Sequence, residues 1–236
     1  MASLIMAIWD VDGTIADTER YGHLPACNEA MRQLGLDLEW SWTEFRDLLP
    51  RIPGNANRLR HELARKGYAE AEIEDYVGRF TPLKKELYID KYLKEVQLRP
   101  GVRALMTQMI EAGIRLAIIS TSHEAQIKAL LRGRLPDLWP HFEHVLGKES
   151  GPKTRSDGLL HRLLLERTGL NADEVLMVED AENGLQAARA ARIETIVCYN
   201  DYTRTQDFRG ALAVVPTLEA LTLEQLIVFH QTIQTV

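Results

Sequence analysis

The segment Leu4-Ile5-Met6-Ala7-Ile8-Trp9 is followed directly by Asp10-Val11-Asp12-Gly13-Thr14. The apolar run predicts a buried β-strand, because a short apolar segment that ends in turn-forming residues is typical of a parallel sheet. Asp10 and Asp12 come after the carboxyl end of this strand, where open α/β sheets bind ligands. The two carboxylates can therefore point into one crevice, although Asp and Gly also suit a plain turn.

Other short apolar segments predict further strands of the same sheet. These segments alternate with helical patterns at about 123–131, 157–168 and 181–191, and they span residues 115–119, 143–146, 174–178, 195–198 and 211–215. Strands that alternate with helices are the signature of a parallel sheet covered by helices. The chain is therefore predicted to have an α/β fold.

A long helical block interrupts this alternation. Between about residues 18 and 95 the patterns are helical, at 19–34, 43–49, 57–66 and 70–93, with no convincing strand. A block of this size inserted after the first strand is large enough to form a separate small domain. We therefore expect a core formed by residues 1–17 and 96–236, and a helical domain formed by residues 18–95.

A second acidic pair, Glu179-Asp180, ends the strand predicted at 174–178. Carboxylates that are brought together repel each other unless a cation lies between them. Mg2+ fits this arrangement, because it takes one or two carboxylates together with water and phosphate oxygens.

Hydroxyl side chains and one lysine complete the candidate site. Ser120-Thr121-Ser122 follows the strand at 115–119 and precedes a helix, where hydroxyls and free amides can bind phosphate. Ordinary N-capping of that helix by Ser120 or Ser122 is the alternative. Lys153 lies in a loop before the next helix, a position in which a lone lysine is usually solvated.

Composition argues for a small anionic substrate and against nucleic acid. The formal net charge is -6 and the pI is about 5.7, whereas nucleic-acid binders carry a basic excess. The two cysteines suggest no disulfide or zinc framework, and we find no signal peptide or membrane span. We expect a cytoplasmic monomer without a membrane partner.

The order of these motifs, strand–DxDGT, strand–Ser, Lys before a helix and strand–Glu-Asp, resembles the four motifs of the haloacid dehalogenase superfamily. The resemblance covers essentially the whole chain and implies a Rossmann-like parallel sheet core with an inserted α-helical C1 cap domain. It implies that Asp10 is the nucleophile and Asp12 the general acid and base. Ser120 and Lys153 would neutralise and orient the transferring phosphoryl group.

The same resemblance implies a Mg2+ site and a phosphotransferase activity. The Asp10 carboxylate, the Asp12 backbone carbonyl and Asp180 would hold the ion, with Glu179 assisting. The dehalogenase branch generally lacks the second aspartate, so the presence of Asp12 favours a phosphatase.

Within the superfamily, several segments resemble the CbbY subfamily, whose implied substrate is xylulose-1,5-bisphosphate. They are Asp17-Thr18-Glu19, Gly22-His23, Leu98-Arg99-Pro100-Gly101-Val102 and Asp201-Tyr202-Thr203. The substrate-binding residues that this resemblance implies are Thr14, Glu19, His23, Arg58, Lys84 and Thr121. The chain departs from the subfamily at Pro53-Gly54-Asn55-Ala56-Asn57, where a glycine and a lysine of the usual Gly-Gly-Lys-Glu-Arg segment are replaced and Arg58 is kept.

Other interpretations stay open at this point. Glu19 and His23 are four residues apart on a predicted helix and can pair with each other, while Arg58 and Lys84 can be solvated. Trp40 and Trp42 are expected in the core of the helical domain. A mutase resembling β-phosphoglucomutase would use the same Asp10 and Asp12, and a non-catalytic sugar-phosphate sensor is the third hypothesis.

Overall fold

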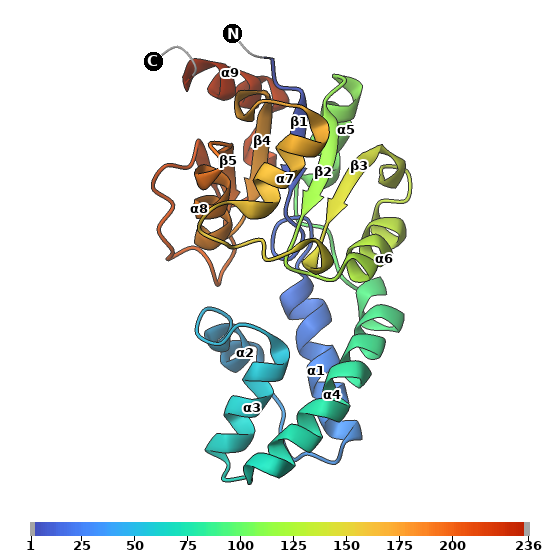
Figure 1. Ribbon diagram of the computed structural model, residues 1–236. Helices are drawn as coiled ribbons and strands as arrows, with labels where there is room; N and C mark the ends of the chain where they lie inside the picture. Colours follow the sequence, from blue (N-terminus) through green and yellow to red (C-terminus); the bar gives the residue numbers. More distant parts are fainter. Residues whose placement is uncertain (1–2, 234–236) are drawn as a thin grey trace. The chain divides into compact units, whose positions relative to one another are not determined.

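The computed structural model of the protein describes residues 3–233, so residues 1–2 and 234–236 of the predicted core lie outside the described residues. The chain divides into two compact units (Figure 1). The first contains Met1–Asp17 and Leu98–Val236, and the second contains Thr18–Gln97.

A six-stranded sheet forms the centre of the first unit, in the order β3-β2-β1-β4-β5-β6, and every neighbouring pair is parallel. The strands are β1 (Met6–Trp9), β2 (Arg115–Ile119), β3 (Phe142–Leu146), β4 (Val175–Glu179), β5 (Glu194–Cys198) and β6 (Ala213–Val215). Each of the six corresponds to a predicted apolar segment. The α/β fold with a parallel sheet is therefore confirmed.

Helices cover this sheet because the central strands are apolar on both faces. All four residues of β1 and all five of β4 are buried, which a parallel sheet achieves only when both faces are covered. The covering helices are α5 (Val102–Glu111), α6 (Glu124–Arg134), α7 (Leu159–Thr168), α8 (Glu182–Ala190) and α9 (Leu223–Ile233). The sequence patterns did not indicate α9, which contacts α5.

One hydrophobic cluster of this unit joins the sheet to two helices. Met6, Ile8 and Met177 from the strands pack with Leu160 and Leu164 of α7, and α8 adds Ala188. Their burial holds β1 and β4 side by side, in the register that pairs Trp9 with Val178. The residues that follow these two strands are therefore neighbours.

The described secondary structure of the second unit, Thr18–Gln97, consists of helices joined by loops. Its α-helices are α1 (Leu24–Gln33), α2 (Trp42–Leu48), α3 (Asn55–Arg65) and α4 (Glu70–Asp90); the short helices Glu19–His23 and Tyr92–Lys94 flank them. Trp40 is buried in the core of this unit and Trp42 packs against it, as predicted.

Local sequence explains where α2 begins. The Ser41 hydroxyl accepts a hydrogen bond from the backbone N–H of Glu44, and the Glu44 carboxylate accepts one from the N–H of Ser41, so the two residues form a capping box.

Among residues 3–233, none of the helices combines the length and the apolar character that a membrane crossing requires.

Candidate active site

Asp10 occupies the carboxyl end of β1 with its side chain buried. Its backbone N–H donates to the Val178 carbonyl oxygen at 3.0 Å, which ties it to the end of β4. Asp10 Oδ2 accepts a hydrogen bond from Thr14 Oγ1 at 3.0 Å, and Oδ1 lies 2.5 Å from Lys153 Nζ. Burial raises the pKa of Asp10, the charge of Asp12 adds to this rise, and the ammonium of Lys153 opposes it.

Lys153 is buried and contacts two carboxylates, so the solvated alternative for this residue is wrong. Its Nζ donates to Asp10 Oδ1 and, at 3.0 Å, to Glu179 Oε1. Burial by itself would lower the pKa of Lys153, but the charges of Asp10 and Glu179 together outweigh burial and raise it. Lys153 is therefore a fixed positive charge beside the Asp10 carboxylate.

Glu179 and Asp180 are buried at the end of β4. The backbone of Gly184 makes room for Glu179, because a Cβ at position 184 would lie 1.4 Å from Glu179 Oε1. Burial and the Asp10 charge raise the pKa of Glu179 well above its usual value. The same two causes raise the pKa of Asp180 to about 7. The positive charges of Lys153 and Arg99 and the hydrogen bond from Asn200 lower this pKa, but they do not cancel the rise.

Three of these carboxylates form a group that fits a divalent cation. Asp10, Glu179 and Asp180 each offer an oxygen, these oxygens lie within 4.8 Å of one another, and all three residues are buried. Burial is the main cause of the raised pKa of all three groups, and the charge of a neighbouring carboxylate adds to it; a bound cation would offset both effects. Oxygen donors of this kind are those that hard cations take.

The Asp12 carboxylate points to a different partner, Ser122. Ser122 Oγ donates to Asp12 Oδ2 at 2.5 Å, and the Ser122 backbone N–H donates to Ser120 Oγ at 3.1 Å. Ser120 is buried and Thr121 is exposed. Within this hydroxyl run the predicted site contains Ser120 and Thr121 but not Ser122.

The capping alternative for this hydroxyl run is wrong. The residue that precedes α6 as its N-cap is His123, and its side chain makes no capping hydrogen bond. The hydroxyls of Ser120 and Ser122 instead belong to the loop that follows β2.

In the helical unit, two candidate substrate residues contact each other. Lys84 Nζ lies 2.6 Å from His23 Nδ1, and the His23 ring stacks on Tyr88 with the ring centroids 4.2 Å apart. Lys84 and His23 are both buried, so the solvated alternative for Lys84 is wrong. Glu19 is half-buried.

Arg58 is also buried, and its guanidinium is partly used within the unit. Nε donates to the Ile52 carbonyl oxygen at 2.9 Å and Nη1 donates to Asn55 Oδ1 at 2.7 Å. The solvated alternative for Arg58 is therefore wrong as well. The altered segment that contains Asn55 holds Arg58 in place.

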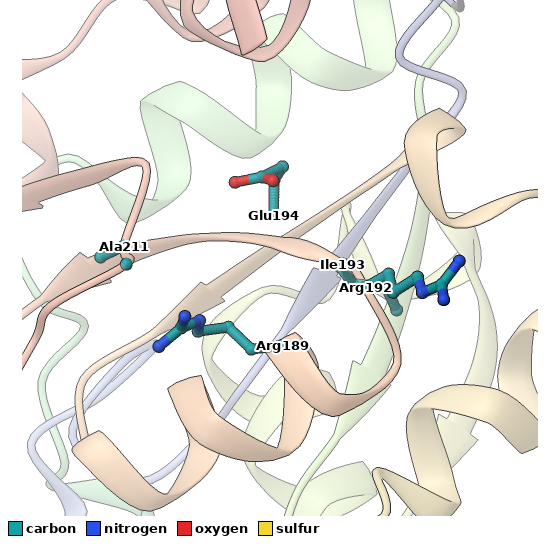
Figure 2. Close-up of a pocket in the computed structure, with 6 residues that line it drawn as sticks. Arg189, Arg192, Ile193, Glu194 and Ala211 are labelled. Carbon is teal, nitrogen blue, oxygen red and sulfur yellow. The ribbon is translucent and has the colours of Figure 1, made fainter. Parts of the chain in front are cut away.

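A separate hollow of about 310 Å³ lies at the other edge of the sheet, beside the amino ends of β5 and β6. It is lined by Arg189, Arg192, Ile193, Glu194, Gly210 and Ala211. Figure 2 shows the guanidinium groups of Arg189 and Arg192 pointing away from each other. Because its charged groups do not converge, this hollow is not the candidate site.

Comparisons with known proteins identify the family of the chain. Residues 6–192 match the family model of the haloacid dehalogenase-like hydrolases. The chain is 35% identical over 216 residues to the plasmid-encoded protein CbbY of Cupriavidus necator, an alignment that covers 89% of this chain and 84% of that protein. It is 30% identical over 190 residues to a phosphorylated carbohydrates phosphatase of Thermotoga maritima, covering 80% of this chain and 82% of that protein.

A solved structure of similar fold is a variant of CbbY from Rhodobacter sphaeroides in complex with xylulose-(1,5)bisphosphate. The two structures superpose with a TM-score of 0.77 at 29% identity, over 94% of this chain and 99% of the other. The chain therefore belongs to the haloacid dehalogenase-like hydrolases, as a phosphatase related to CbbY.

Proposed function

We propose that this protein is a Mg2+-dependent phosphatase of sugar phosphates that forms an aspartyl-phosphate on Asp10. The observation that carries the proposal is the convergence of Asp10, Lys153, Glu179 and Asp180, four buried charged side chains from three separate segments. Burying a charge costs free energy unless the charge pairs with another charge or binds a ligand. Perturbed carboxylates grouped at the carboxyl end of a parallel sheet favour a catalytic role.

Asp10 and Asp12 share the chemistry between them. The Asp10 carboxylate attacks phosphorus, the bond from phosphorus to the sugar oxygen breaks, and Asp12 gives that oxygen a proton. Asp12 then takes a proton from water, the water oxygen attacks phosphorus, and the bond to Asp10 breaks to release inorganic phosphate. The hydrogen bond from Ser122 holds the Asp12 carboxylate in one orientation between the two steps.

The remaining residues orient the Asp10 carboxylate and the phosphoryl group and neutralise the negative charge of the phosphoryl group. Lys153 and Ser120 face the phosphoryl group, and Thr14 holds Asp10 Oδ2 so that the carboxylate cannot rotate freely. Asp10, Asp180 and the Asp12 carbonyl would hold Mg2+, with Glu179 assisting; the bound ion supplies positive charge to the phosphoryl oxygens.

For the substrate we propose xylulose-1,5-bisphosphate or a related sugar bisphosphate. The support is the similarity to CbbY of Rhodobacter sphaeroides, whose structure holds that compound. Thr14 and Thr121 of the first unit, with Glu19, His23, Arg58 and Lys84 of the helical unit, are the proposed substrate residues, and the helical unit is the proposed cap. We also propose that the protein acts in the cytoplasm as a monomer.

Phosphate release from a panel of sugar phosphates tests the proposal. The panel contains xylulose-1,5-bisphosphate, ribulose-1,5-bisphosphate and β-glucose-1-phosphate, each with Mg2+ and again after chelation. We expect Mg2+-dependent phosphate release, strongest with xylulose-1,5-bisphosphate. An isomerised sugar phosphate without free phosphate would indicate a mutase instead, and no reaction at all would favour a sensor.

Two matched variants test the nucleophile. Asp10→Asn should abolish turnover while the far-UV circular dichroism stays unchanged, because the amide cannot attack phosphorus. Asp137→Asn is the control, since Asp137 is an exposed carboxylate that pairs with Arg103. Full activity in Asp10→Asn would refute the mechanism.

A further inference from the structure

Arg99 joins three loops at the carboxyl edge of the sheet. Its Nη1 donates to the carbonyl oxygens of Gly13 and Cys198, both at 2.5 Å, and its Nη2 donates to those of Tyr199 at 2.6 Å and Pro216 at 3.1 Å. Gly13 follows β1, Cys198 ends β5 and Pro216 follows β6. A planar guanidinium with several fixed donors can serve these acceptors together, which a lysine ammonium cannot.

Gly13 lies directly against the acidic cluster. Its φ of +86° is in the left-handed region, and a Cβ there would be 2.5 Å from Asp180 Oδ2 and 2.8 Å from Asn200 Nδ2. The Gly13 N–H donates to the Ala16 carbonyl oxygen at 2.9 Å. The peptide that carries the Asp12 carbonyl is therefore held by Ala16 at the N–H of Gly13, while Arg99 holds Gly13 at its carbonyl.

Asn200 orients the Asp180 carboxylate. Its Nδ2 donates to Asp180 Oδ2 at 2.6 Å. Its Oδ1 accepts hydrogen bonds from the backbone N–H groups of Tyr202 and Thr203, both at 3.1 Å. Because these turn amides bind the oxygen of the side-chain amide, the NH2 group must face Asp180.

We propose that Arg99 and Asn200 are positioning residues for the cation site. Asn200 acts through Asp180, and Arg99 acts through Gly13 on the Asp12 carbonyl, so the two residues together set the geometry of two cation ligands. The inference rests on the Mg2+-dependent function proposed above. Partners that orient metal ligands from outside typically change metal affinity or activity by 10- to 100-fold.

Isothermal calorimetry of Mg2+ binding tests the inference without turnover. Asn200→Ala and Asn200→Ser should weaken Mg2+ binding about 10- to 100-fold. The serine hydroxyl can still accept from the turn amides but is too short to reach Asp180. Arg99→Met should weaken binding within the same range, and Arg99→Lys, which restores one or two of the hydrogen bonds, should fall between Arg99→Met and the unmodified protein.

Kinetics add a second readout. In each variant the Mg2+ concentration required for half-maximal activity should rise in parallel with the calorimetric Kd. At saturating Mg2+, KM for the sugar phosphate should remain near that of the unmodified protein. If Arg99 and Asn200 have a purely structural role, their variants should show an unchanged Kd for Mg2+ and an unchanged Mg2+ concentration for half-maximal activity.

A stability control separates positioning from folding. Ile196→Val shortens a buried side chain of β5 and should lower the thermal stability modestly without changing Mg2+ affinity. If the Asn200 and Arg99 variants lose stability but bind Mg2+ as the unmodified protein does, the inference is overturned. If the folded, unmodified protein binds no Mg2+, both the proposed function and this inference are refuted. If it binds Mg2+ but releases no phosphate, only the proposed function is refuted.

Discussion

His161 should make the protein less stable in acid, and His161→Leu should remove that sensitivity. The residue lies on α7 and is fully buried, and neither ring nitrogen has a hydrogen-bond partner among the described residues. Burial, followed by the positive charge of Lys153, lowers the pKa of His161 to about 3. The folded protein therefore keeps this ring neutral.

The pH range over which stability is lost follows from the difference in the pKa of His161 between the folded and the unfolded protein. The unfolded chain binds a proton on His161 below its ordinary pKa of 6.5, whereas the folded protein does so only near 3. Between these values the unfolded state holds more protons, so the free energy of unfolding falls as the pH falls. At 1.36 kcal/mol per pH unit, the loss of stability at pH 5 is about 2 kcal/mol, and at pH 7 it is only about 0.2 kcal/mol.

Urea unfolding of the parent protein and of His161→Leu at pH 5, 6 and 7 measures this loss. Leucine has a similar volume and cannot take up a proton. The stability of His161→Leu relative to the parent should therefore increase by about 2 kcal/mol between pH 7 and pH 5. Any difference in packing is common to all pH values and cancels in this comparison.

A control variant is His141→Gln, which removes an exposed histidine and should leave the pH dependence of the parent. If His161→Leu and the parent differ in stability by the same amount at pH 5 and at pH 7, His161 is protonated equally in both states. The reasoning from burial would then be wrong.

Three further perturbations test the site and the backbone. Gly184→Ala should lower kcat at least tenfold, because the new methyl displaces Glu179 from Lys153, although alanine favours the helix by about 1 kcal/mol; activity with thermal unfolding separates the two effects. Ser122→Ala should lower kcat about 10- to 100-fold with KM unchanged, since a hydrogen bond to a charged group is worth about 1.5–3 kcal/mol. Steady-state kinetics measure the change, and an equal rise in KM would contradict it. Arg192→Gly should raise Tm by about 2–4 °C, because Arg192 has a left-handed φ of 62° that costs about 1 kcal/mol; an unchanged Tm would show that this backbone is not strained.

Most of the first unit was readable from the sequence because strand signals are local. A short apolar run bounded by turn residues indicated each strand of the sheet, and the predicted and observed bounds of β2 agree at 115–119. The missed helix α9 follows β6 and a short helical turn at Leu218–Ala220. No helix was predicted beyond the last predicted strand at 211–215.

The candidate site was partly readable for the same reason. Asp10, Glu179 and Asp180 were chosen because each comes at the end of a strand, and parallel strands bring their carboxyl ends to one edge. Lys153 was chosen only through the resemblance, since a lysine in a loop has no local pattern that distinguishes a buried ion pair from a solvated side chain. Arg99 and Asn200 were assigned no role, and Ser122 was considered only as part of the hydroxyl run or as an N-cap.

The sequence by itself determined the approximate bounds of the strands and their order along the chain. Because the carboxylates follow the ends of these strands, it also determined which edge of the sheet carries them. Only the tertiary structure decided which side chains meet there. Lys153 reaches Asp10 across 143 positions of the chain, and Ser122 reaches Asp12 across 110. Such pairs depend on loop conformation and on the register between strands, whereas hydrophobic periodicity records only which face of an element is buried.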